Sequence, residues 1–313
     1  MKIYAPNYYN AFKCIADKCN HSCCVGWEID IDNKTLDYYK NVEGDFGNKL
    51  RKNISFDENP HFKLCQNERC PFLNSNNLCE IILNLGEEHL SQICTDHPRY
   101  RNFFEDRLEI GLGLCCEEAV RILLSEKNKT TVVLICENDL KEEQNSELSN
   151  LILKTRQRAF EILQNRKIPL KNRINNLIDE FNLKIPNKSN CEWYKVFYNL
   201  ERLSNEWTVK LSHLKSNKSF AENSDFEIPF EQLIIYFLYR YLPQATDDTE
   251  IKAYMCFAIL SFNIIKTIFY LENANNNSLK PLSEIVRLYS SEIEYSEENI
   301  NTLIDILWEE NYF

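Results

Sequence analysis

The spacing of apolar positions changes in character close to residue 149. From there to the C-terminus, apolar side chains recur every three to four residues, which is the spacing of one face of an α-helix. Residues 251–270 are apolar on nearly all sides, so we expect them to form the buried centre of a C-terminal helical bundle. The pattern predicts helices over 149–164, 170–181, 191–214, 228–241, 249–271, 282–294 and 300–308.

Before residue 137 the apolar runs are shorter and are interrupted by turn residues. Asp32 can cap a helix that runs through Tyr39, and Gly86 can end a helix that begins at Cys79. The aromatic residues among the first 13 are expected to pack over the cysteine-rich segment, or alternatively to line a substrate pocket. The remaining predicted elements are a helix after Gly44, hairpins over 61–73 (turn at 66–68) and 100–112, helices over 88–94 and 115–124, and a strand over 131–136.

Together these elements predict a mainly α fold in two domains. Residues 1–136 would form a small, irregular α+β module that is rich in cysteine, and residues 149–313 a helical bundle. The polar, acidic stretch between them, 137–148, is expected to be a linker, and 216–225 a polar loop. Metal ligands can replace the apolar core that such a small irregular module lacks.

Net charge narrows the range of partners. The formal charge is −11, which argues against nucleic acid as the main partner and permits a lysine-bearing protein as substrate. The first residues do not resemble a secretory signal, and the apolar run 253–265 is too short to span a bilayer. We therefore expect a cytoplasmic protein, without a membrane partner, whose thiols stay reduced.

Ten of the thirteen cysteines and four of the five histidines lie within the first 116 residues. Such crowding usually holds a soft metal or an iron–sulfur cluster, while a disulfide framework or small buried hydrophobes are the alternatives. Paired Cys-x2-Cys motifs of a standard zinc finger are absent, and the irregular spacing better suits a cluster bound by several loops. The candidate ligands are Cys14, Cys19, Cys23, Cys24, Cys70, Cys79 and Cys94.

The number of metal centres stays open at this point. One [4Fe–4S] cluster needs four thiolates, so the surplus could form a second centre or surround the first. Zinc is the alternative metal. Of each adjacent pair, Cys23-Cys24 and Cys115-Cys116, we expect one member to be structural.

Charged residues near the cysteines are candidates for further roles. Arg99 and Arg101 follow Cys94 and could stabilise a cluster or bind a carboxylate ligand, or they could be solvated charges on a hairpin. Glu117 and Glu118 could serve as a catalytic base, although acidic residues are also common at helix N-termini.

Several motifs resemble known families. Five features resemble the cysteine-rich YkgJ-type module, which is described as zinc- or iron-chelating: Phe12-Lys13-Cys14, Cys23-Cys24, Cys70-Pro71-Phe72-Leu73, Cys79-Glu80-Ile81, and Cys94 with a proline soon after it. The chain resembles the flagellin lysine-N-methylase (FliB-like) family more closely, over about residues 1–125. The motifs are Tyr4-Ala5-Pro6-Asn7-Tyr8-Tyr9, Cys24-Val25-Gly26-Trp27-Glu28-Ile29, Leu85-Gly86-Glu87-Glu88 and Gly111-Leu112-Gly113-Leu114-Cys115-Cys116-Glu117-Glu118.

This second resemblance implies methylation of lysine side chains on a flagellin-like protein, with S-adenosylmethionine and an iron–sulfur cluster as cofactors. The chain has only six glycines and no glycine-rich loop after a strand, so a nucleotide-fold donor site is not expected. The Cys-x3-Cys-x2-Cys triplet of radical S-adenosylmethionine enzymes is also missing, because Gly26 stands at its third position. We therefore expect the methyl donor to bind through the cysteine module.

Two other functions compete with methyl transfer. One is a non-enzymatic metal-binding or redox-sensing protein whose helical half contacts a partner. The other is a zinc-stabilised adaptor without redox chemistry. Bound iron and sulfide distinguish the adaptor from the other two, and binding of S-adenosylmethionine distinguishes the enzyme from the sensor.

Overall fold

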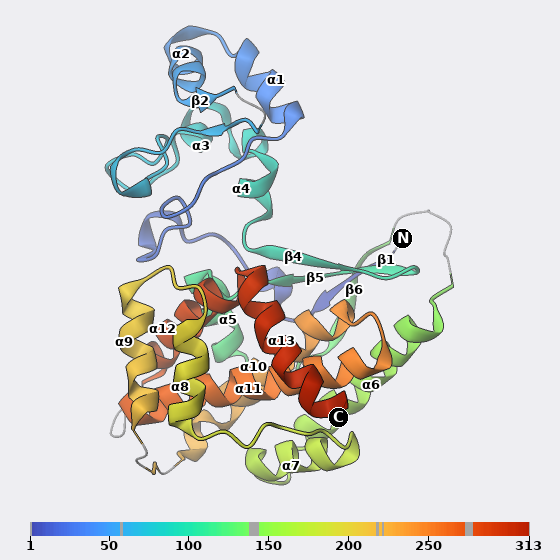
Figure 1. Ribbon diagram of the computed structural model, residues 1–313. Helices are drawn as coiled ribbons and strands as arrows, with labels where there is room; N and C mark the ends of the chain where they lie inside the picture. The colour runs from blue at the N-terminus through green and yellow to red at the C-terminus, as the bar shows by residue number, and fades with distance from the viewer. Residues whose placement is uncertain are drawn as a thin grey trace. The chain divides into compact units, whose positions relative to one another are not determined.

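The computed structural model describes residues 2–56, 59–137, 144–216, 219–220, 222–272 and 278–312 (Figure 1). The chain divides into two compact units. We call the first the helical unit; it comprises Met1–Phe12, Arg101–Cys115 and Ala119–Phe313. The second, the cysteine unit, comprises Lys13–Tyr100 and Cys116–Glu118. The fold is mainly α-helical with a small mixed sheet, as the sequence predicted.

The division differs from the predicted boundary at residues 137–148 because of a four-stranded sheet. β1 (Lys2–Pro6) pairs in parallel with β5 (Arg107–Leu112) and antiparallel with β6 (Val132–Glu137). With β4 (Arg99–Phe103) outside β5, the strand order is β4-β5-β1-β6. The chain start is therefore an inner strand of the helical unit.

Hydrogen bonds attach this sheet to the helices of its own unit. The Tyr239 hydroxyl donates to the Ile110 carbonyl at 3.1 Å, and the Asn102 amide donates to the Arg240 carbonyl at 3.1 Å. Both helical partners lie on α10 (Glu227–Tyr241). Residues 101–115 therefore fold with the C-terminal helices, although they follow the cysteine-rich segment in sequence.

The helical unit is built around α10 and α11 (Asp248–Glu272), whose side chains are buried along most of their length. The expected buried centre at 251–270 is thus confirmed. By length and composition α11 could cross a membrane, but 83% of its apolar window is buried inside the fold, as in a core helix. The other long helices are α6 (Glu147–Leu163), α7 (Leu170–Glu180), α8 (Asn190–Asn199), α9 (Asn205–Ser212), α12 (Leu279–Tyr289) and α13 (Glu297–Tyr312).

The single helix predicted over 191–214 is wrong, because two helices occupy this stretch. α8 begins with a capping box in which Ser189 and Glu192 exchange hydrogen bonds, and it ends at Asn199. The Ser204 side chain then accepts a hydrogen bond from the Trp207 N–H and caps α9. Ser204 therefore begins a second helix within a stretch whose apolar spacing alone predicts one continuous helix. Of the expected linker, residues 138–143 lie outside the described part, as do 217, 218 and 221 of the expected loop.

The cysteine unit consists of short elements around its own core. α1 (Asn33–Asn41) is capped by Asp32, whose side chain accepts from the Thr35 N–H, as predicted. β2 (Ile54–Ser55) pairs with β3 (His61–Phe62). The predicted hairpin over 61–73 is wrong in its pairing, although residues 66–68 do form a turn. The remaining helices are α2 (Gly44–Lys52), α3 (Glu80–Leu85), α4 (Gln92–Asp96) and α5 (Glu117–Ser125), which runs from this unit into the helical one.

Short helical turns complete the chain. Gly86 ends α3 with a φ of 101°, a conformation that favours glycine, as expected for a helix C-cap. The predicted helix over 88–94 is instead a turn followed by α4, with Leu90 and Ser91 extended between them. Single turns of 3-10 helix cover Tyr9–Ala11, Ala16–Lys18, Gln66–Glu68, Glu87–His89, His213–Lys215, Ser224–Phe226 and Leu242–Gln244, and a π-helical turn covers Ser290–Glu294.

Candidate metal centre

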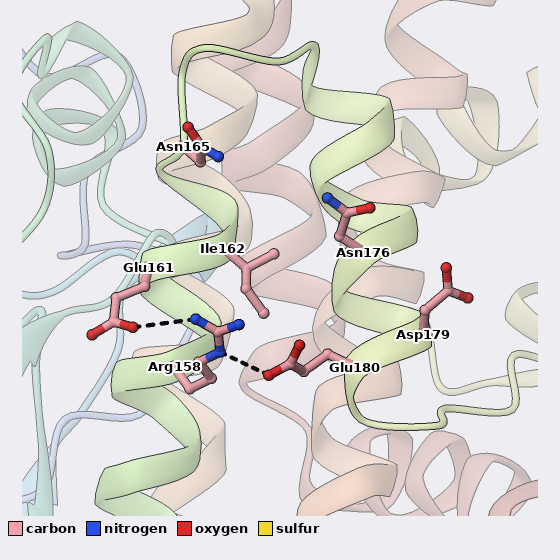
Figure 2. A pocket seen from close by; sticks show the side chains of 7 residues that line it. All are labelled: Arg158, Glu161, Ile162, Asn165, Asn176, Asp179 and Glu180. Carbon is pink, nitrogen blue, oxygen red and sulfur yellow. Dashed lines mark hydrogen bonds and ion pairs between the residues drawn. The ribbon is translucent and has the colours of Figure 1, made fainter.

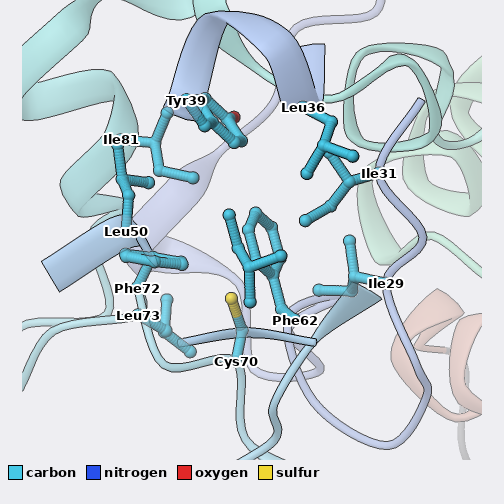
Figure 3. Close-up of a cluster of buried hydrophobic side chains, with 11 residues drawn as sticks. Ile29, Ile31, Leu36, Tyr39, Leu50, Phe62, Cys70, Phe72, Leu73 and Ile81 are labelled. Atoms are coloured by element: carbon cyan, nitrogen blue, oxygen red, sulfur yellow. The ribbon is translucent and has the colours of Figure 1, made fainter. Parts of the chain in front are cut away.

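Four cysteines share one apolar core in the cysteine unit. Cys70 is only 6% exposed and belongs to the buried cluster around Phe62 and Phe72 (Figure 3). Cys24, Cys79 and Cys94 pack against the same cluster. We call these four residues the inner thiol set. They come from three separate parts of the chain, as expected for a site assembled by folding and not by one local motif.

Local backbone contacts bring three members of the inner thiol set together. The Cys70 N–H donates to the Cys24 carbonyl at 2.8 Å. Cys79 is the N-cap residue of α3 and lies in an isolated bridge with Leu73, three residues after Cys70. The fourth member, Cys94, is held in α4. Irregular sequence spacing therefore corresponds to a compact arrangement in space.

The pKa values of these thiols reflect burial and their mutual charge. Burial raises the pKa of Cys70 to about 12 and that of Cys94 to about 11, and it also raises the pKa of Cys79. A thiolate at Cys24 would raise the pKa of the other three further. The pKa of Cys24 itself is lowered by a hydrogen bond from the Cys23 thiol, and secondarily by Ser22 and the charge of Arg69. Without metal, most of this set is therefore held as neutral thiols.

A second group of thiols lies in the same unit, where Glu117 joins residues 116–118 to the loop after Cys19. The Glu117 carboxylate accepts hydrogen bonds from the Asn20 N–H and side-chain amide, both at 2.9 Å, and from the Cys19 thiol at 3.7 Å. Burial raises the pKa of Cys19 to about 11, and the charge of Cys116 adds to this. We call Cys14, Cys19, Cys23 and Cys116 the outer thiol set.

Cys23 connects the two sets. Its pKa is raised chiefly because its thiol is hydrogen-bonded to Cys24, then by burial and by the charges of Cys24, Cys14 and Cys116. The two sulfurs of the adjacent pair thus meet each other. Cys116 was not among the predicted ligands, although it lies in the Cys115-Cys116 pair and in the FliB-like motif at 111–118.

The other cysteines lie outside both sets. Cys65 and Cys136 are exposed. Cys115 belongs to the helical unit, where its thiol is hydrogen-bonded to Tyr295. Cys256 is buried and donates to the Lys184 carbonyl at 3.6 Å. Adjacent residues 115 and 116 therefore have different surroundings.

The predicted charged residues are placed as follows. Arg99 is half-buried, donates to the Thr95 carbonyl at 3.0 Å and belongs to the cysteine unit, whereas Arg101 is exposed and belongs to the helical unit. Glu118 is only 6% exposed. Burial alone would raise the pKa of Glu117, but the hydrogen bonds from Asn20 outweigh it and the pKa is lowered. A carboxylate held in this way is a poor proton acceptor near neutral pH. Glu117 is better described as a residue that holds the loop at Asn20 in place.

The inner thiol set offers thiol sulfur, which is the donor type that a thiophilic metal binds. Within the described ranges, no three His, Cys, Asp or Glu side chains form a group that could hold a single metal ion. Neutral thiols must first release their protons to bind metal, and ligand positions adjust on binding. Four clustered thiols on a small core are the ligand type and number that an iron–sulfur cluster or a structural zinc requires.

A separate polar pocket lies within the helical unit, between α6 and α7 (Figure 2). Its volume is about 530 Å³. Arg158 pairs there with Glu180 at 2.8 Å and Glu161 at 3.6 Å, so its charge is already balanced. The pocket has no cysteine in its lining, and its chemistry is that of a solvated ion-pair network.

The fold and the thiol sets define a mainly helical protein with a separate cysteine-rich unit. Residues 174–313 match the model of the FliB lysine N-methylase C-terminal domain. The chain is 26% identical over 133 residues to the lysine-N-methylases of Salmonella typhimurium and Salmonella choleraesuis, covering 39% of this chain and 32% of each relative. It is equally similar to the flagellar biosynthetic protein FliU of Salmonella muenchen, of which it covers 76%. No solved structure matches.

Residues 174–313 are therefore similar to the C-terminal domain of the FliB-like family. The resemblance recognised from the sequence is therefore confirmed, but by a different part of the chain. The motifs had pointed to residues 1–125, whereas the family model matches the helical half. The chain spans about a third of the length of the lysine-N-methylases that it matches.

Proposed function

We propose that this protein methylates lysine side chains of a flagellin-like protein, with S-adenosylmethionine as methyl donor and an iron–sulfur cluster held by the cysteine unit. The observation that carries the reaction class is the match of residues 174–313 to the FliB lysine N-methylase C-terminal domain. The names of the curated relatives, lysine-N-methylase and FliU, support lysine methylation and a flagellar substrate.

The inner thiol set supports the cofactor part of the proposal. Cys24, Cys70, Cys79 and Cys94 supply the four thiolates that one cluster takes. Arg69 lies close enough to lower the pKa of Cys24, so it also offsets the negative charge of a thiolate site. When bound, the cluster would supply an iron that activates the methyl donor.

The chain's own residues would bind and orient the two substrates. Arg99 and Arg101 remain the candidates for pairing with the donor carboxylate, since a guanidinium pairs strongly with a carboxylate. The net charge of −11 favours approach of a lysine-bearing, basic surface. The helical unit, which carries the family match, is the part proposed to hold the protein substrate.

Mass spectrometry of flagellin incubated anaerobically with enzyme, S-adenosylmethionine and reductant tests this function. We expect a mass increase of one or more methyl groups on lysine peptides. Cys94→Ser should abolish the increase, whereas Cys191→Ser, in a half-buried site outside both thiol sets, should retain it. Full methylation by metal-stripped protein would exclude the cluster, and no methylation under any reducing condition would favour a non-enzymatic metal-binding or redox-sensing protein.

A further inference from the structure

A second pocket of the helical unit lies between one face of the sheet and α6. Its lining includes Tyr4, Arg107 and Val132 from β1, β5 and β6, and Phe160 and Gln164 from α6 and the residue that follows it. We call this cavity the sheet pocket. Its volume is about 410 Å³, which is within the range of about 300–1,000 Å³ that is usual for small-molecule sites.

A chain of hydrogen bonds leads to the sheet pocket and has a fixed direction. The Gln232 amide nitrogen donates to the Asn128 carbonyl at 2.6 Å, and the Gln232 oxygen accepts from the Thr130 hydroxyl at 2.5 Å. The Gln164 amide nitrogen donates to the Thr130 carbonyl at 3.1 Å. Because backbone carbonyl groups only accept hydrogen bonds, both side-chain amides must present their nitrogen atoms to them. The orientation of the Gln164 amide is therefore fixed, and its oxygen is the acceptor that this wall of the pocket offers.

This oxygen is a buried acceptor without a donor. Gln164 is only 6% exposed, and its side-chain oxygen has no hydrogen-bond partner among the described residues. The Thr130 hydroxyl cannot serve as the donor, because it is already hydrogen-bonded to Gln232. A buried acceptor in this state lowers stability unless a bound molecule supplies an N–H or O–H group. The sheet pocket therefore suits a ligand that presents a hydrogen-bond donor to Gln164.

The walls of the sheet pocket favour a flat ligand. Tyr4 and Phe160 supply aromatic surface, and Phe160 is buried. The Arg107 guanidinium lies 4.8 Å from the centre of the Tyr4 ring, which holds both side chains in place. Nucleobases stack favourably on aromatic side chains and on guanidinium groups. A planar base thus fits these walls better than a flexible chain does.

The charges around the sheet pocket favour an anion. Among the described residues that line it, three are cationic and one is acidic, although the whole chain has a net charge of −11: Arg107, Lys129, Arg156 and Glu161. The two arginines are each held by a carboxylate, Asp106 for Arg107 and Glu109 for Arg156. Lys129 is exposed, so it is the cation best placed to pair with a charged group of a ligand.

We propose that the sheet pocket binds an adenine nucleotide, or a similar anionic molecule whose base carries an exocyclic amine. The amine donates to the Gln164 oxygen, the base lies against Tyr4 and Phe160, and the anionic group pairs with Lys129. Because Gln164 can only accept at this position, a base with an oxo group there is rejected. The proposal goes beyond the proposed function, because it assigns a ligand site to the helical unit, apart from the thiols and from methyl transfer.

Isothermal titration calorimetry of the anaerobically purified full-length protein tests this site. The probes are adenosine monophosphate and inosine monophosphate, which differ in that an oxo group replaces the exocyclic amine. We expect the inosine nucleotide to bind roughly 5- to 150-fold more weakly, the range for a buried acceptor left without a donor. S-adenosylhomocysteine, which joins adenine to a carboxylate, distinguishes two sources. If it binds with the same dependence on Gln164, the ligand is the adenine part of the methyl donor; if only the nucleotide binds, the ligand is a separate one.

Two variants separate the contacts to the base from those to the anion. Gln164→Leu should remove the preference for the adenine nucleotide over the inosine nucleotide. Lys129→Ala should weaken both nucleotides equally and leave uncharged adenosine unaffected. Lys167→Ala, which removes an exposed lysine outside the lining of the pocket, is the matched control and should bind like the wild type. Because Lys129 is exposed, its variant keeps the proposal testable even if Gln164→Leu does not fold.

Three results would overturn the proposal. They are no heat of binding with millimolar adenosine monophosphate, equal affinity for both nucleotides in the wild type, and an unchanged preference in a folded Gln164→Leu variant. The last two would mean that the Gln164 oxygen is satisfied by water and does not select a ligand. Because binding is measured without methyl transfer, failure of the proposed function leaves this test intact.

Discussion

The ion pair between Glu109 and Arg156 offers the sharpest test of how the sheet is attached to the helices of its unit. Glu109 on β5 is fully buried and Arg156 on α6 is 5% exposed. Two hydrogen bonds of 2.5 and 2.7 Å join them, and the guanidinium lies 5.0 Å from the centre of the Tyr239 ring. Burial disfavours the charged guanidinium, but Glu109 outweighs it and the pKa of Arg156 is raised.

Replacing one partner should lower the free energy of unfolding by far more than the intact pair contributes to it. Glu109→Gln keeps the shape but leaves Arg156 as a buried, unpaired charge, which typically costs about 3–5 kcal/mol. In a unit of this size, 1 kcal/mol lowers the melting temperature by roughly 2–4 °C, so we expect a decrease of about 6–20 °C. Arg156→Met should cost a similar amount, because it leaves a buried carboxylate without a partner.

The double variant Glu109→Gln/Arg156→Met tests whether the buried, unpaired charge causes the loss of stability. If burial of an unpaired charge is the cause, the double variant should be about as stable as either single variant, or more stable. Urea unfolding followed by circular dichroism gives the three free energies of unfolding. Costs that add to within about 0.5 kcal/mol would refute the argument. Glu180→Gln, which removes the half-exposed pair with Arg158 shown in Figure 2, is the control and should leave the midpoint nearly unchanged.

Three further predictions concern the cysteine unit. Cys70→Ser should lower iron content and the thermal stability of the metal-loaded protein, whereas Cys191→Ser should change neither. Equal metal loss from both variants would contradict the assignment of the inner thiol set as metal ligands. Arg99→Ala should weaken S-adenosylmethionine binding roughly 10- to 100-fold, as loss of a charge-assisted hydrogen bond does, with iron retained; unchanged affinity by calorimetry would remove Arg99 from the donor site. Burial, aided by Arg99, lowers the pKa of His97 to about 4 from 6.5, so the folded protein binds fewer protons than the unfolded one between these values. Stability should therefore be lost as pH falls from about 6.5 to 4, by on the order of 1–3 kcal/mol, and His97→Gln should remove that part of the pH dependence; an unchanged slope would mean that His97 does not titrate as described.

The sequence by itself determined much of the helical unit. The all-round apolar stretch 251–270 could only be stable in a core, and α11 is buried as predicted. Local signals were equally reliable where one residue decides the conformation. Asp32 caps α1, and Gly86 adopts a positive φ at the end of α3. Such features depend on neighbours within a few residues, so they can be read from a short stretch of chain.

Tertiary structure alone decided the pairing of distant segments. Nothing in the first residues shows that β1 lies between β5 and β6, because a strand's partners are set by packing and not by its own pattern. The two thiol sets have the same origin. Cysteine spacing indicated a metal module, but whether Cys116 or Cys65 joins the others depends on how loops far apart in sequence meet. The clustering of cysteines was thus visible in the sequence. Which cysteines lie near one another required the fold, because contacts such as that of Glu117 with Asn20 join residues almost a hundred positions apart.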